Sequence, residues 1–364
     1  MTTQQPHPGP RADDARSATQ PGGRRRLDPA QEYDVPTRLP RLTSPRAARA
    51  AMLATALAWV VGTVVCGTAV VAVPTPEWIA RPGAALLLVV FSIGLTHRAG
   101  GHMRLWTVFS AVLALAAAVS GTNVLVASAA ALTAILSTVW AVVATRPAES
   151  LLGSLREYVV ALAVGTSGAV AVAAWNAPVQ HQRFSLVVIA AALGLAIAIV
   201  WSLGAGLHGL GRQNVAVIVG VAAVFVLLLA YSSFVRTHGS QVLVDGMTDL
   251  VIWMRQTFGG VPRPIEVLVG FPALIVGVSL RSRRREGWWL LVFAVLGTGV
   301  LTTSLVSPGA YPSYIGLSTL YSVVLGGLIG IVLRHVMLNQ RSARSARAIL
   351  PESRVEPGRL APLK

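Results

Sequence analysis

Residues 123–144 read NVLVASAAALTAILSTVWAVVA, a stretch without a single charged side chain. A helix needs about 20 mainly apolar residues to cross the hydrocarbon core of a bilayer. Comparable apolar stretches follow one another between residues 50 and 337, and short polar segments separate them. This alternation predicts an all-α, polytopic membrane protein in which the spanning helices pack into one bundle.

The apolar stretches predict ten membrane-spanning helices within a transmembrane domain at residues 48–337. The expected spans are 50–73, 78–96, 104–120, 123–144, 158–177, 184–206, 215–235, 264–280, 288–307 and 315–335. Residues 1–47 and 338–364 contain no apolar stretch of that length. Such segments cannot bury enough apolar surface to fold. We therefore expect a disordered N-terminal tail and a disordered, basic C-terminal tail.

The composition excludes several classes of protein. Hydrophobic residues make up 54% of the 364 residues, charged residues make up only 12%, and the mean hydropathy is +0.65. A soluble domain usually carries about 25% charged residues. The chain is therefore not expected to be a soluble enzyme or a disordered protein, and the lipid bilayer is its first expected partner.

The net charge of +16 does not by itself indicate a nucleic-acid partner. Nucleic-acid-binding surfaces combine clustered basic residues with aromatic side chains, whereas most tryptophans here lie near the ends of the predicted spans. The single cysteine, Cys66, excludes an internal disulfide and a cysteine-based metal centre. Neither a cofactor, a metal ion nor a nucleic acid is expected.

The basic residues predict the orientation in the membrane. If the N-terminus is cytoplasmic, the outer side receives only five of the 30 basic residues: Arg81, Arg183, Arg236, Arg255 and Arg263. Loops on the cytoplasmic side of membrane proteins carry the excess of arginine and lysine. The prediction is a multi-pass protein of the cytoplasmic membrane with both termini in the cytoplasm.

An outer loop at residues 236–263 contains the segment QVLVDGMTDLVIWMRQTF at 241–258. If this segment crossed the membrane, Asp245, Asp249 and Arg255 would each cost about 2.5–3.5 kcal/mol at the centre of a span. On a helix these polar residues share one face, and Leu243, Met247, Leu250, Val251, Met254 and Phe258 share the other. We therefore predict an amphipathic helix that lies on the outer membrane surface.

The candidate functional residues follow from this loop. Carboxylates four residues apart repel each other on a helix, so a cation or a basic partner group near Asp245 and Asp249 would relieve them. A solvated helix face is the preferred explanation of the pair. The predicted outer mouth of the next span also carries charge. The candidate polar contacts are Asp245, Asp249, Arg255, Arg263 and Glu266.

Glycine and proline residues mark three further features. Gly259 and Gly260 are expected to form a hinge after the outer helix, and Pro272 beside Gly270 is expected to kink the eighth span. Gly326 and Gly330 form a G-x-x-x-G pattern in the tenth span, which allows close helix packing. That packing is either internal to the chain or the seam of a homo-oligomer.

No catalytic constellation is apparent, and no motif indicates a family. No acidic residue, arginine or histidine is expected in the middle of a span, which argues against transport coupled through a buried carboxylate. The preferred interpretation is a permease or transporter of a small amphipathic or lipid-linked substrate, and not an enzyme. The alternative is a non-catalytic accessory or scaffold subunit of a transport or envelope-biogenesis complex, with a membrane or extracytoplasmic protein as partner.

Overall fold

The computed structural model describes residues 45–71, 77–203, 241–282, 287–306 and 311–345, with a few positions between 219 and 227 and between 356 and 363. The chain divides into two units, Met1–Arg41 and Leu42–Lys364, and all described residues lie in the second. Every regular element among them is a helix, which confirms the all-α prediction.

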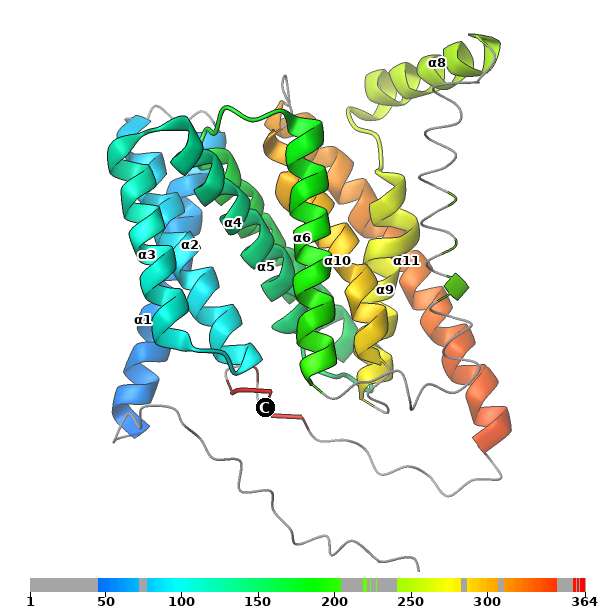
Figure 1. The fold of residues 1–364 in the computed structure, drawn as a ribbon. Coiled ribbons are helices and arrows are strands. Elements are labelled where there is room, and N and C mark those ends of the chain that lie inside the picture. Colours follow the sequence, from blue (N-terminus) through cyan, green and yellow to red (C-terminus); the bar gives the residue numbers. More distant parts are fainter. Residues whose placement is uncertain are drawn as a thin grey trace, which may run out of the picture. The chain divides into compact units, whose positions relative to one another are not determined.

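The described helices follow one another in the order that the apolar stretches predict (Figure 1). They are α1 (Pro45–Val70), α2 (Glu77–Ala99), α3 (Met103–Ser120), α4 (Asn123–Val143), α5 (Leu151–Ala174), α6 (His181–Ser202), α8 (Gln241–Phe258), the π-helix η3 (Glu266–Gly270), α9 (Phe271–Arg281), α10 (Gly287–Thr303), the 3₁₀-helix η4 (Ser304–Val306) and α11 (Pro312–Ser345).

Among the described residues, eight helical segments are long and apolar enough to cross a membrane. They correspond to the predicted spans one to six, nine and ten. The predicted seventh span, 215–235, lies outside the described residues except at four positions. The predicted eighth span differs from a single long helix, because α9 has only 11 residues and η3 precedes it.

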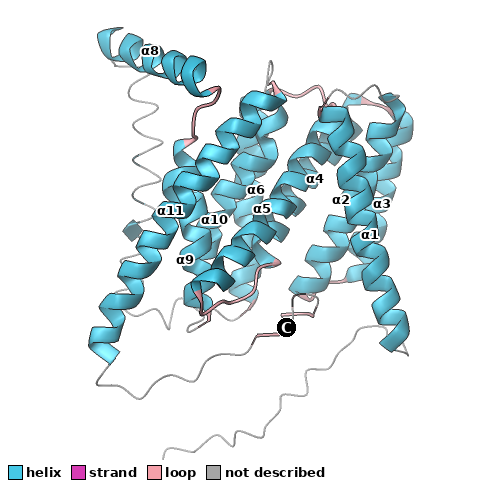
Figure 2. Cartoon of the chain, turned by 180° about the vertical axis from the view of Figure 1, so that it is seen from behind, coloured by secondary structure: helices cyan, strands magenta, loops and turns pink. Residues whose placement is uncertain are grey.

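The helices α4, α5 and α10 form the centre of the bundle, and each contacts the other two. The helices α1, α2 and α3 gather on one side of this group, and α9 and α11 lie on the other (Figure 2). The central α10 is almost wholly buried. The surrounding helices α1, α3, α6 and α11 turn large apolar side chains outward, as expected for surfaces that face lipid.

Small residues allow the close packing around α9. Gly270 lies directly against the backbone of Gly297 on α10, where a Cβ atom would have no room. On α11, Gly326 lies against Phe271, and Gly330 lies against Ile275. This face of α11, which carries the G-x-x-x-G pattern, is therefore occupied within the chain.

Candidate functional site

Residues 259–263, which follow α8, enter the bundle without helical structure. Gly259 has a φ of 68°, and a Cβ atom on Gly260 would lie 2.7 Å from the backbone nitrogen of Ser318. Both positions of the predicted hinge therefore need glycine, one for its backbone conformation and one for the close approach. This segment brings the charged residues that follow it against α11.

Two serine hydroxyls of α11 satisfy the backbone of this segment. The backbone N–H of Val261 donates to Oγ of Ser318 at 3.0 Å, and that of Arg263 donates to Oγ of Ser322 at 2.8 Å. Residues four apart lie on one face of a helix, so the two hydroxyls form a short ladder. Irregular backbone at membrane depth requires such internal partners.

The contacts of η3 show how far the chain that follows α8 has entered the bundle. A Cβ atom on Gly326 would lie 3.2 Å from the carbonyl oxygen of Glu266, and Gly326 is close to the middle of the candidate span Pro312–Leu338. Gly270 likewise lies against Gly297, near the middle of the candidate span Gly287–Val306. The π-helix η3 therefore begins in the interior of the bundle.

Arg263 and Glu266 were expected at the outer mouth of the eighth span, and the structure buries the side chain of Glu266 in the bundle beside α11. Extended chain advances about 3.3 Å per residue, whereas a helix advances 1.5 Å. Hydropathy counts residues, so it does not register the extra advance of a non-helical segment that precedes η3.

Arg263 and Glu266 form an ion pair inside the bundle. Nη1 of Arg263 lies 2.9 Å from Oε1 of Glu266, and the side chain of Glu266 is fully buried while that of Arg263 is 22% exposed. Nη1 also lies 3.4 Å from the hydroxyl of Thr319. Oε2 of Glu266 has no hydrogen-bond partner in the part of the chain that the structure describes. A buried carboxylate oxygen without a donor is costly, and it marks a place where a ligand group or a proton would be stabilised.

The predicted kink coincides with a change in helix type. Pro272 is the second residue of α9, and the five residues before α9 form the π-helix, in which the N–H of Phe271 bonds to the carbonyl of Glu266. A proline has no N–H and displaces the carbonyl of the preceding turn, which favours a wider turn there. Such π-turns recur at functional sites.

Tyr158 of α5 completes this region from the opposite side. Its ring packs edge-on against Phe271 with centroids 5.8 Å apart, and its hydroxyl donates to the carbonyl of Val323 at 2.9 Å. Sequence reasoning missed Tyr158 and the hydroxyl residues of α11. A usable signal was present, because Ser318, Thr319 and Ser322 place hydroxyls one turn apart inside an apolar span.

The helix α8 begins and ends where the amphipathic segment was predicted, at residues 241 and 258. Asp245 and Asp249 are exposed on it, so the structure does not bring them to the buried Arg263–Glu266 pair. The guanidinium of Arg255 lies 4.8 Å from the ring centre of Tyr314 at the start of α11. Leu250, Val251 and Phe258 of the apolar face are about half exposed.

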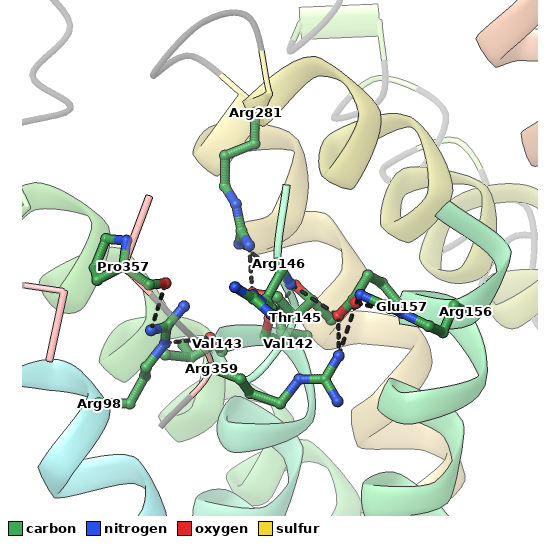
Figure 3. Close-up of polar contacts among 10 residues, drawn as sticks. All are labelled: Arg98, Val142, Val143, Thr145, Arg146, Arg156, Glu157, Arg281, Pro357 and Arg359. Carbon is green, nitrogen blue, oxygen red and sulfur yellow. Dashed lines mark hydrogen bonds and ion pairs between the residues drawn. The ribbon is translucent and has the colours of Figure 1, made fainter. Parts of the chain in front are cut away.

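A second charged cluster is formed by residues near the end of α2, the start of α5 and the end of α9, and Figure 3 shows its contacts. Its centre is Glu157 of α5, whose side chain is 1% exposed. Oε2 accepts from the backbone N–H of Arg146 at 2.9 Å, and Oε1 lies 3.0 Å from Nη2 of Arg156. Nη2 of Arg359 lies 2.6 Å from Oε2 and 2.7 Å from Oε1. Both oxygens therefore have donors.

Two buried arginines extend this cluster. Arg281 at the end of α9 donates to Thr145, and its guanidinium lies 4.2 Å from the ring centre of Trp288. Arg98 at the end of α2 donates to the carbonyl of Val143 at 3.4 Å. The distribution of basic residues predicts that these arginines lie on one side of the membrane, and the structure gathers them at one end of the bundle.

Comparison of the chain with protein families, with characterised proteins and with solved structures finds no match. The length and hydropathy of the helices define the class on their own: this is a multi-pass integral membrane protein.

Proposed function

We propose that the protein is a permease or transporter of the cytoplasmic membrane, and that it binds a small amphipathic or lipid-linked substrate beside η3. The observation that carries the proposal is the Arg263–Glu266 ion pair, which lies buried where the eighth span begins with the π-helix η3. Ionisable residues inside a membrane domain are costly and typically serve function. Single π-helical turns also recur at functional sites.

The chemistry of the pair favours a substrate with a charged head group. The guanidinium of Arg263 suits a phosphate or carboxylate, which it can bind through two N–H groups. The unpartnered oxygen of Glu266 suits an ammonium group or a proton. Phe271 and Tyr158 supply an apolar wall nearby, which suits the hydrocarbon part of the same molecule.

A scaffold or accessory subunit is the second candidate function. The observation in its favour is α8, whose polar and apolar residues are both exposed. A helix of this kind is suited to the outer membrane surface or to a partner protein. The proposed orientation, with both termini in the cytoplasm, places α8 on the outer side.

Ligand-induced thermal stabilisation of the purified protein tests the transporter proposal. A ligand that binds only the folded state raises the melting temperature, so a panel of zwitterionic and anionic single-chain lipids is compared with a neutral detergent of equal chain length. We expect stabilisation by at least one charged lipid, and loss of that stabilisation in the variants Arg263→Gln and Glu266→Gln.

The variant Glu149→Gln is the matched control, because Glu149 is exposed at the far end of the bundle. It should retain the full ligand response. The proposal is overturned if no charged lipid stabilises the parent protein, or if Arg263→Gln and Glu266→Gln respond as the parent does.

A further inference from the structure

The described residues between 356 and 363 lie against the end of the bundle that carries Glu157. They belong to the segment for which disorder was expected, and that expectation does not hold for the positions described here: 356, 357, 359 and 361–363. The amino-acid pattern gave no signal for this, because the attachment joins residues that are far apart in the sequence. Glu157 and Arg359, for example, are separated by 202 positions.

Two ion pairs attach this segment: it supplies the basic residue of one pair and the acidic residue of the other. Arg359 of the segment pairs with Glu157 of α5 at 2.6 Å. Glu356 of the segment lies 3.4 Å from Nε of Arg281, and both of these side chains are almost completely buried. The bundle thus offers one acid and one base, and the segment offers the complementary base and acid.

The backbone of the segment is held as well. Nη1 of Arg98 donates to the carbonyl of Ala361 at 2.7 Å and to that of Pro357 at 3.4 Å. The N–H of Leu363 donates to the carbonyl of Arg98 at 3.0 Å, and the side chain of Leu363 packs against the apolar core. The segment is therefore bound in a defined register.

We propose that the segment with the described residues 356, 357, 359 and 361–363 acts as a strap that docks in cis on the inner end of the bundle and holds it closed. The strap ties together α2 through Arg98, α5 through Glu157 and α9 through Arg281. Alternating access requires one part of a bundle to move against another. A strap across these three helices opposes that movement, so it acts as an autoinhibitory contact.

The position of α9 connects the strap with the proposed site. Glu266 precedes α9 and Arg281 ends it, so one continuous helical segment carries the buried ion pair at one end and the strap contact at the other. The inhibitory role rests on the proposed transport function. The docking of the strap does not rest on it.

The chemistry of the attachment makes the strap releasable. Ion pairs lose much of their attraction to the cost of removing both charges from water, so they hold the segment without a large net free energy. After release, Arg98, Glu157 and Arg281 would regain water, and Leu363 would leave the apolar core against which it packs.

Thiol labelling of Thr145→Cys tests whether the strap docks. Thr145 is fully buried and contacts Arg281 beside the strap, and replacing Cys66 by alanine removes the one natural thiol. In nanodiscs, which leave both membrane faces open, a polar maleimide should label Thr145→Cys slowly in the full chain. Removal of residues 356–364 should raise the rate at least tenfold.

Point variants keep the test decisive if the truncated chain does not fold. Arg359→Glu should accelerate labelling because it places two carboxylates together, whereas Arg359→Lys should stay close to the parent because it retains the charge. A cysteine at Glu149, which is exposed, should react at the same rate in every background. An unchanged rate for Thr145→Cys after both truncation and Arg359→Glu would overturn the proposal.

A crosslink distinguishes docking in cis from docking between two copies. Ala99→Cys and Leu363→Cys place thiols on neighbouring backbone positions, since the N–H of Leu363 bonds to Arg98. A short bismaleimide should give a crosslinked monomer after dilution with cysteine-free chains. A covalent dimer would overturn docking in cis.

The inhibitory role has its own readout. A charged lipid that stabilises the parent should also accelerate labelling of Thr145→Cys in the full chain. Failure of the lipid to do so, with docking confirmed by truncation, would overturn the inhibitory role and leave the docking intact. Failure of every lipid to bind would instead overturn the proposed function.

Discussion

Two buried carboxylates of the bundle, Glu157 of α5 and Glu266 of η3, differ in how completely their oxygens are satisfied. Glu157 receives donors at both oxygens, from the backbone of Arg146 and from the side chains of Arg156 and Arg359. Glu266 is equally buried, but among the described residues it has one ion-pair partner, Arg263, at Oε1. A buried carboxylate whose oxygens both receive hydrogen bonds stabilises one structure, whereas a carboxylate with an oxygen that lacks a donor is suited to binding a ligand. The same residue type thus serves attachment at one end and, as we propose, binding in the interior.

The strongest test of this comparison is one substitution made at both sites. Glu157→Gln should lower the free energy of unfolding by about 3 kcal/mol, because the new amide NH₂ group would face N–H donors and charge-assisted hydrogen bonds are worth about 1.5–3 kcal/mol each. Glu266→Gln should cost only about 1 kcal/mol, because its NH₂ group can replace the oxygen that lacks a donor. Chemical or thermal unfolding in detergent measures both losses.

The exposed Glu149 provides the reference for this pair of variants, since Glu149→Gln should change stability by less than about 0.5 kcal/mol. Equal losses at Glu157 and Glu266 would contradict the distinction between a satisfied and an unsatisfied carboxylate. A larger loss at Glu266 would indicate that its buried charge supports the fold itself.

A smaller effect is expected where the extended segment meets α11. Ser322→Ala removes the hydroxyl that accepts the backbone N–H of Arg263, and a buried N–H without a partner costs about 1–3 kcal/mol. The same variant should weaken ligand stabilisation, because it loosens the residue that carries the guanidinium. Ser313→Ala, at an exposed position near the start of α11, is the control for both measurements. Equal stability and equal ligand response of the two variants would show that the hydroxyl of Ser322 does not hold the segment.

The sequence was sufficient wherever apolar length alone decides the structure. The uncharged stretch at 123–144 predicts α4, and its observed bounds, Asn123–Val143, agree. The bounds of α8 were also predictable, because Gly259 and Gly260 end the pattern. In both cases the signal is local, and the partners of each residue need not be known.

The sequence was insufficient wherever the structure depends on contacts between distant residues. The depth of Glu266 is set by hydroxyls of α11 that hold an extended segment, and hydropathy does not record them. The strap depends on the pairing of Arg359 with Glu157, which no periodicity reveals. Of the candidate polar residues, the structure pairs Arg263 with Glu266 and leaves Asp245 and Asp249 on a separate helix. Their role remains a prediction.

The smallest expected effect on stability concerns these two aspartates. Asp245→Asn combined with Asp249→Asn keeps the shape of α8 and removes two exposed charges. Like charges one turn apart destabilise a helix by a few tenths of a kcal/mol, so stability should stay constant or rise slightly.

If α8 docks a basic partner, the double variant should nevertheless fail to complement a deletion strain while its expression and membrane insertion stay normal. The matched control is Gln256→Ala on the same helix, which leaves both carboxylates in place. Full complementation by the double variant would show that the carboxylates form only a solvated face, and the functional role would then rest on the interior pair of Arg263 and Glu266 alone.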